Sequence, residues 1–225
     1  MKKPIVIAVF LTLFLSSGNA SIIEHNGYSL DTSTNIVSNG NLEWLRWDKT
    51  AGLSIDDANS LYASSGWRLA SNQDMSGLFS SFFSGKAWDD DENTGQGFRY
   101  PWDVAEDSAA INLIELFGST LDAAGASWGG DPNDMRNRTV VLFGNDLDAD
   151  NLYNWLLIQD DFTEIDGSYV DGDARLQEDS RSASYKESTI GVALVRVVPE
   201  PSVLLLMGLG LIGLSFTRRH QKLAS

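Results

Sequence analysis

The sequence contains no cysteine among its 225 residues. This absence excludes disulfides, thiolate metal sites and cysteine nucleophiles. Histidine is almost as scarce, because only His25 and His220 occur. A Ser-His-Asp triad would depend on His25, close to the N-terminus, and histidine-based zinc sites need more ligands than the chain holds. No HExxH motif or phosphate-binding glycine loop occurs either. The sequence therefore predicts a protein that is not an enzyme, with no catalytic residues.

Positive charge is also scarce, with 16 basic residues against 31 acidic ones and a formal net charge of −15. Five of the basic residues lie near the two ends of the chain, which leaves 11 against the 31 acids; these five are Lys2, Lys3, Arg218, Arg219 and Lys222. Such a surface repels phosphate backbones, so we expect no nucleic-acid partner. It also offers many oxygen ligands to hard cations such as calcium.

Residues 1–20 have the pattern of a secretory signal peptide. Lys2 and Lys3 precede an apolar run over residues 5–15, and small residues follow up to Ala20. A basic start, a short apolar core and small residues at the end are what signal peptidase reads. We therefore expect cleavage between Ala20 and Ser21 and an exported domain over residues 21–197.

The exported domain reads as a single mixed α+β domain. Asn39-Gly40 is a turn dipeptide between two extended runs. Helices are expected to begin after Ser54 and Ser71, since each serine is followed three residues later by an aspartate that completes a capping box. A third helix is expected over 105–117, and strands over 139–144, 152–159 and 188–198. We expect the last strand to be one central strand that pairs with the first, because it is almost continuously apolar.

Residues 145–151 carry Asp146, Asp148 and Asp150 at alternate positions. This is how calcium loops begin, because alternating oxygens can converge on one ion. The EF-hand pattern would then require Gly at position 151 and Glu at position 157, where the chain has Asn and Leu. An acidic hairpin loop in solvent explains the same composition, because Asn and Asp favour turns. Both interpretations stay open at this point.

Three tryptophans lie among acids and amides: Trp88, Trp102 and Trp128. Glycan sites combine aromatic faces with planar polar groups, because sugar C–H faces stack and hydroxyls need paired hydrogen bonds. The alternative is that these rings pack under loops. Pairs of carboxylates could also serve a secreted polysaccharide hydrolase, although the sequence does not select a pair.

Residues 198–225 carry three features in order. The tripeptide Pro199, Glu200 and Pro201 precedes an apolar run over 203–216, and Arg218 and Arg219 follow. This segment resembles the PEP-CTERM sorting signal of Gram-negative bacteria. The resemblance implies processing by exosortase, a membrane enzyme similar to proteases and transpeptidases. It further implies export across the inner membrane to the cell surface or matrix, in association with exopolysaccharide and biofilm.

The central domain has a second resemblance. The run Gly66-Trp67-Arg68-Leu69-Ala70-Ser71 follows an expected helix and precedes another. This order is similar to exported PEP-CTERM proteins of unknown function and to the C-type-lectin-like domains of bacterial surface adhesins. The proline and cysteines frequent in those domains are missing here. The resemblance implies a lectin-like fold and glycan binding.

The apolar run 203–216 has 14 residues and would extend about 21 Å as a helix. A stable transmembrane helix needs about 20 residues, so the run is short for a permanent anchor. The arginines that follow it would stay cytoplasmic and leave the acidic domain outside. We therefore expect contact with the inner membrane to be transient.

Processing at both ends is the first testable prediction. The protein recovered from the surface or matrix should lack residues 1–20 and most of residues 202–225, which intact-mass spectrometry would measure directly. An exported protein that still contains residues 202–225 would contradict the temporary role of the tail.

Overall fold

The computed structural model describes residues 21–101, 105–121, 136–161 and 172–198. The expected signal peptide, Trp102, Trp128 and the sorting segment from Pro199 onward lie outside these ranges. Within the described residues, no helix is both long enough and apolar enough to cross a membrane.

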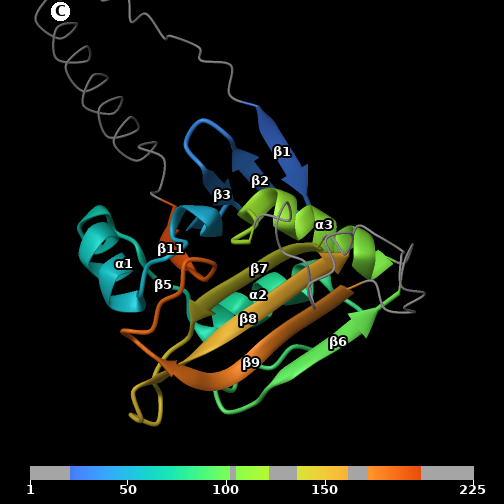
Figure 1. Cartoon of the computed structure of the whole chain (residues 1–225). Coiled ribbons are helices and arrows are strands. Elements are labelled where there is room, and N and C mark those ends of the chain that lie inside the picture. The colour runs from blue at the N-terminus through green and yellow to red at the C-terminus, as the bar shows by residue number, and fades with distance from the viewer. Residues whose placement is uncertain (1–20, 102–104, 122–135, 162–171, 199–225) are drawn as a thin grey trace, which may run out of the picture.

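Two sheets form the scaffold (Figure 1). The six-stranded sheet has the order β1 (Ile22–His25), β2 (Tyr28–Asp31), β3 (Ile36–Ser38), β4 (Leu42–Leu45), β11 (Leu194–Val197), β5 (Arg68–Leu69). The five-stranded sheet has the order β10 (Gly191–Val192), β7 (Arg136–Phe143), β8 (Leu152–Asp161), β9 (Gly172–Ser182), β6 (Gln96–Tyr100). Strand β10 runs parallel to β7, and the other paired strands are antiparallel.

Three α-helices begin and end close to where the sequence predicts: α1 (Ile55–Tyr62), α2 (Asn72–Phe82) and α3 (Ala105–Phe117). Two 3-10 helices accompany them: η1 (Trp47–Lys49) and η2 (Ala63–Ser65). Both capping boxes are present, with Asp57 and Asp74 completing those of Ser54 and Ser71. These helices and the two sheets confirm the α+β class.

The last strand is central as expected, because β11 lies between β4 and β5, but it is not one continuous strand and does not pair with the first. Gly191 and Val192 pair with β7, whereas Leu194–Val197 pair with β4 and β5. The change of sheet occurs at Ala193, whose N–H donates to Leu142 O at 2.9 Å and whose carbonyl accepts from Ala70 N at 2.8 Å. Strand β1 pairs with β2.

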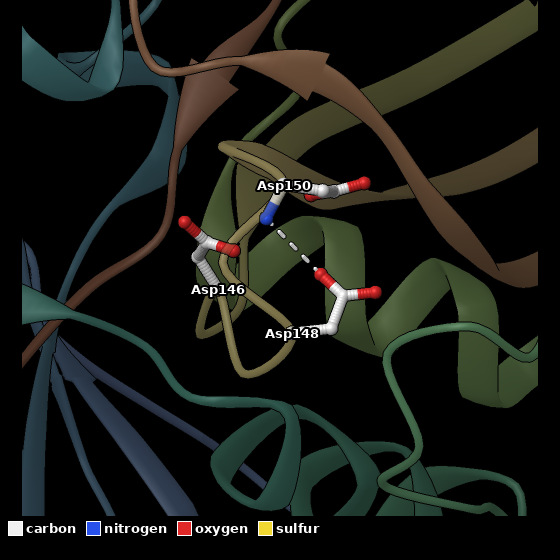
Figure 2. A group of neighbouring side chains, drawn as sticks. All are labelled: Asp146, Asp148 and Asp150. Atoms are coloured by element: carbon white, nitrogen blue, oxygen red, sulfur yellow. Dashed lines mark hydrogen bonds between the residues drawn. The ribbon is translucent and has the colours of Figure 1, made fainter.

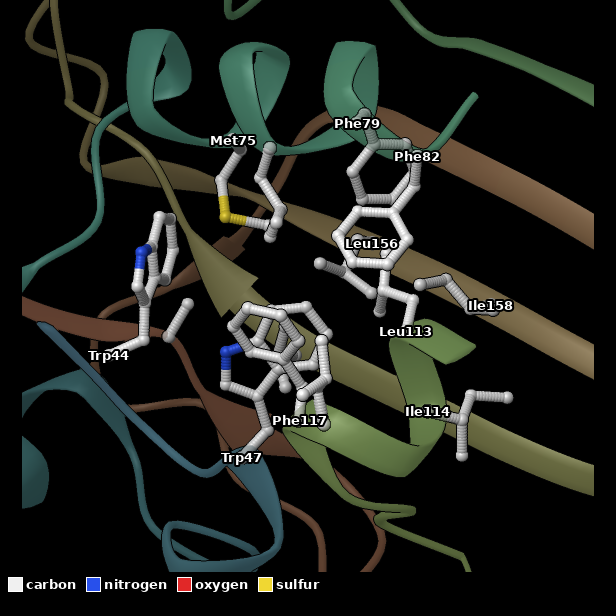
Figure 3. Packing of buried hydrophobic residues seen from close by; sticks show 14 of the residues in the cluster. Trp44, Trp47, Met75, Phe79, Phe82, Leu113, Ile114, Phe117, Leu156 and Ile158 are labelled. Atoms are coloured by element: carbon white, nitrogen blue, oxygen red, sulfur yellow. The ribbon is translucent and has the colours of Figure 1, made fainter. Parts of the chain in front are cut away.

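The main core lies between the sheets and helices α2 and α3 (Figure 3). Leu156 and Ile158 of β8, at alternate positions, face this core and are fully buried. Phe117, at the end of α3, is also fully buried, and its ring centroid lies 4.4 Å from Trp47 and 5.8 Å from Trp44. These contacts join both sheets and α3 into one hydrophobic core.

Phe117→Ala should therefore destabilise the fold strongly, by about 3–5 kcal/mol, because it leaves a cavity where both tryptophans pack. The measurement is the free energy of unfolding in urea. Ile111→Ala, on the same helix but 45% exposed, is the matched control and should cost much less. Equal losses for the two variants would contradict this assignment of the core.

Candidate cation site

The loop between β7 and β8 carries the three aspartates singled out in the sequence. One carboxylate oxygen from each of Asp146, Asp148 and Asp150 can be chosen so that all three lie within 4.8 Å of one another. Figure 2 shows the three side chains around a single turn of this loop. Asp146 is half-buried, and the other two are exposed. The alternate spacing thus does bring the three carboxylates together.

Local backbone geometry makes the turn tight. Gly144 opens the loop with φ 111°, where a Cβ would lie 2.6 Å from Asn154 Oδ1. Ala149 and Asn151 also adopt left-handed backbone, with φ of 65° and 64°. Such conformations are uncommon for residues other than glycine, so the surrounding contacts must hold the loop in this shape.

Backbone N–H groups of residues 150–152 each donate a hydrogen bond to one oxygen of the three carboxylates. Asp148 Oδ1 accepts from Asp150 N at 3.2 Å, and Asp146 Oδ2 accepts from Asn151 N at 3.2 Å. Asp150 Oδ1 accepts from Leu152 N at 2.8 Å. Each aspartate therefore has one oxygen bound to the loop, and its second oxygen remains for a ligand.

Glu92 joins this site from the acidic run 89–93, where the sequence offers several carboxylates and does not select one. It comes from the segment between α2 and β6 and is only 3% exposed. Its two carboxylate oxygens accept from Leu147 N at 2.8 Å and Asp148 N at 2.9 Å. A buried carboxylate therefore holds the middle of the acidic loop and places a further negative charge beside it.

Two buried asparagines fix Glu92 and the loop to the scaffold. Asn154 Nδ2 donates to Glu92 O at 2.7 Å, and Asn72 Nδ2 donates to Asn154 Oδ1 at 2.9 Å. Asn72 Oδ1 accepts from Asn145 N at 2.9 Å. The network joins α2, β8 and both loops, so the geometry of the acidic site is set by regular elements.

Asp179 of β9 also faces this group of charges. The register of β8 and β9 shifts between Tyr153 and Trp155, and within this irregular stretch Asp179 N donates to Glu92 O at 3.1 Å. Burial, and after it the negative charges of Asp150, Asp148 and Glu92, raise the pKa of Asp179. The site therefore concentrates more negative charge than the loop alone supplies.

Two carboxylate oxygens at this site are buried and have no hydrogen-bond partner among the described residues: Asp146 Oδ1 and Asp179 Oδ2. An unpaired buried carboxylate oxygen is costly, and a bound cation would remove that cost. Oxygen ligands of this kind suit calcium. The loop is not an EF-hand, because Leu157 lies within β8 and the additional acids come from distant segments.

Trp88, singled out as a glycan contact, packs within an aromatic group. Its Nε1 donates to Phe83 O at 3.2 Å, and its ring centroid lies 4.8 Å from that of Phe79. Lys86 Nζ lies 5.3 Å from the Trp88 ring centroid. These contacts use much of the half-buried indole for packing. Trp102 and Trp128 lie outside the described residues.

Comparison with known proteins identifies the C-terminal segment. Residues 197–219 match the PEP-CTERM protein-sorting motif, which includes Pro199, Glu200, Pro201, Arg218 and Arg219. The chain thus carries the sorting signal of an exosortase substrate, and this signal implies export and a membrane-held stage before cleavage. No curated protein and no solved structure matches the chain. The resemblance of residues 21–197 to C-type-lectin-like domains therefore stays a prediction.

Asp179→Asn should stabilise the cation-free protein near neutral pH. A raised pKa means that the folded state binds the proton of Asp179 more tightly than the unfolded state does. The folded protein therefore loses stability as pH rises through the raised pKa, and the neutral amide avoids that loss. The measurement is urea unfolding in EGTA across pH.

The advantage of Asp179→Asn should disappear below the ordinary aspartate pKa, where Asp179 is protonated in both states. Asp56→Asn, at an exposed position on α1, is the matched control. A destabilised Asp179→Asn variant at neutral pH would contradict charge repulsion at this site.

Proposed function

We propose that this protein is a non-catalytic component of the cell surface or extracellular matrix, which binds calcium at the 146–150 loop and glycan of the exopolysaccharide. The sorting motif at residues 197–219 supports the destination. The convergence of Asp146, Asp148 and Asp150 beside Glu92 and Asp179 supports the cation. Signal peptidase and exosortase would be its partners only during processing.

The observation that carries the calcium proposal is the pair of buried, unpartnered oxygens, Asp146 Oδ1 and Asp179 Oδ2. A solvated acidic loop would expose its carboxylates to water. Here one oxygen each of Asp146 and Asp179 is buried, Asp179 lies near the charges of Asp150, Asp148 and Glu92, and Glu92 is already held by two backbone N–H groups. A divalent cation would offset this repulsion and supply the missing partner.

A secreted polysaccharide hydrolase is the second candidate, and one observation favours it. The pKa of Asp179 is raised, by burial first and then by Asp150 and Asp148, as is common for a carboxyl that acts as general acid beside ionised neighbours. The calcium proposal explains the same charges without a substrate cleft. If the calcium proposal is correct, the protein should release no reducing sugar from polysaccharide.

Calcium should bind the full chain, purified in detergent micelles after treatment with EGTA. At a free calcium concentration about 100 times the Kd, the melting temperature should rise by about 5–10 °C, because binding to the folded state alone adds about 2.7 kcal/mol. Isothermal titration calorimetry gives the Kd, and thermal unfolding gives the shift.

Asp148→Asn should weaken calcium binding at least tenfold, because it removes a charged ligand and leaves the loop's shape unchanged. Asp56→Asn is the control of equal charge change and should bind calcium normally. Binding by wild-type and Asp148→Asn proteins with equal affinity would place the cation elsewhere, and no binding by the wild type would refute the calcium proposal. Release of reducing sugars that depends on Asp179 would favour the hydrolase.

A further inference from the structure

The face of the five-stranded sheet opposite the main core carries a hollow of about 440 Å³. Its lining includes Gly97 and Arg99 of β6, and Asp173, Arg175, Gln177 and Glu178 of β9. The core-facing residues of β9 are Ala174 and Leu176, so the odd-numbered residues between 173 and 177 project to the other side. Hollows of this volume are large enough for a small ligand.

The polar groups of the hollow are held in place. Arg175 Nε donates to Asp173 Oδ1 at 2.7 Å, and Arg99 Nε lies 3.9 Å from Asp173 Oδ2. Asp173 is buried, and its hydrogen bond raises the pKa of Arg175. The side chain of Arg99 remains 65% exposed, so most of its N–H donors face solvent.

Gly97 has no side chain, so backbone atoms line the hollow at this position. It is the cross-strand partner of Arg175. A Cβ at this position would lie 2.5 Å from Arg175 Cγ and 2.8 Å from Ala174 O. Only glycine therefore allows the stem of Arg175 to lie against β6 while its guanidinium pairs with Asp173.

An apolar row lies next to these polar groups on the same face of the sheet. Trp155 is the cross-strand partner of Gln177, and Leu157 is the partner of Arg175, so their side chains project from the same side. Trp155 is half-buried, and its Nε1 donates to Ser180 Oγ at 3.2 Å. Trp155 and Leu157 also pack against a second group of buried apolar residues, and Arg181 Cζ lies 5.9 Å from the Trp155 ring centroid. The exposed part of the indole therefore lies next to a hollow that holds an amide, a carboxylate and two guanidinium groups.

We propose that this hollow, bordered by Trp155, binds a neutral saccharide segment. Sugar rings expose an apolar C–H face that packs on an indole, and adjacent hydroxyls pair with planar amide, carboxylate and guanidinium groups. Arg99 and Arg175 lie beside Asp173, and Glu178 also lines the hollow, so its lining carries two positive and two negative side chains. The chain as a whole has a net charge of −15 and repels polyanions, which disfavours a uronate polymer. The proposal rests on the glycan-binding part of the proposed function and assigns its site.

The test is calorimetric titration of the full chain, in detergent micelles, with pentasaccharides. The neutral probes are built from glucose, galactose or mannose, and pentagalacturonate is the acidic probe. At least one neutral probe should bind, and pentagalacturonate should bind more weakly. Arg99→Ala and Gln177→Ala should each reduce the affinity for the neutral probe by about tenfold, because each removes hydrogen bonds to hydroxyls.

Gln73→Ala, at an exposed position on α2, is the matched control and should bind the neutral probe as the wild type does. If the wild type binds a neutral probe with an affinity that Arg99→Ala and Gln177→Ala leave unchanged, the site is wrong and glycan binding stands. If no probe binds the wild type, the glycan-binding function itself fails. Tighter binding of pentagalacturonate would overturn the choice of a neutral ligand.

Discussion

The structure depends on the passage of one segment from the five-stranded sheet to the six-stranded sheet at Ala193. On one side of this residue, Val192 N donates to the buried hydroxyl of Thr50 at 2.8 Å. On the other side, β11 pairs with both β4 and β5. A Cβ at Gly191 would lie 2.6 Å from Trp47 O, so β10 and η1 are in close backbone contact. The shared segment fixes the relative position of the two sheets and closes the core around Phe117.

The acidic site is built on this scaffold by polar groups that satisfy one another in the interior. Glu92 bonds the loop through its side chain and accepts from Asn154 through its carbonyl. Desolvating such groups is expensive unless their hydrogen bonds are made, and here the bonds run from α2 to β8 without a gap. The scaffold thus holds several negative charges close together before any cation binds.

Features set by neighbours in sequence were predictable. The capping boxes of α1 and α2 span three residues each, and the alternate spacing that gathers Asp146, Asp148 and Asp150 is equally local. Features that depend on residues far apart in the sequence were not predictable. Glu92 meets Asp148 from 56 residues away, and Asp179 reaches the site through a shift in strand register that leaves no sequence pattern. The split at Ala193 was not predictable for the same reason, because residues 191–195 are buried and apolar on both sides of the break.

The place where the sorting motif joins the domain has a mechanical consequence. The matched motif begins at Val197, the last residue of β11, and Val198 N still donates to Asn41 O at 3.1 Å. Strand β11 lies inside its sheet, between β4 and β5. A force applied to Val198 along the direction of β11 would therefore act on an interior strand. Its bonds to β4 and β5 resist such shear together, whereas an edge strand pulled sideways would unzip one bond at a time.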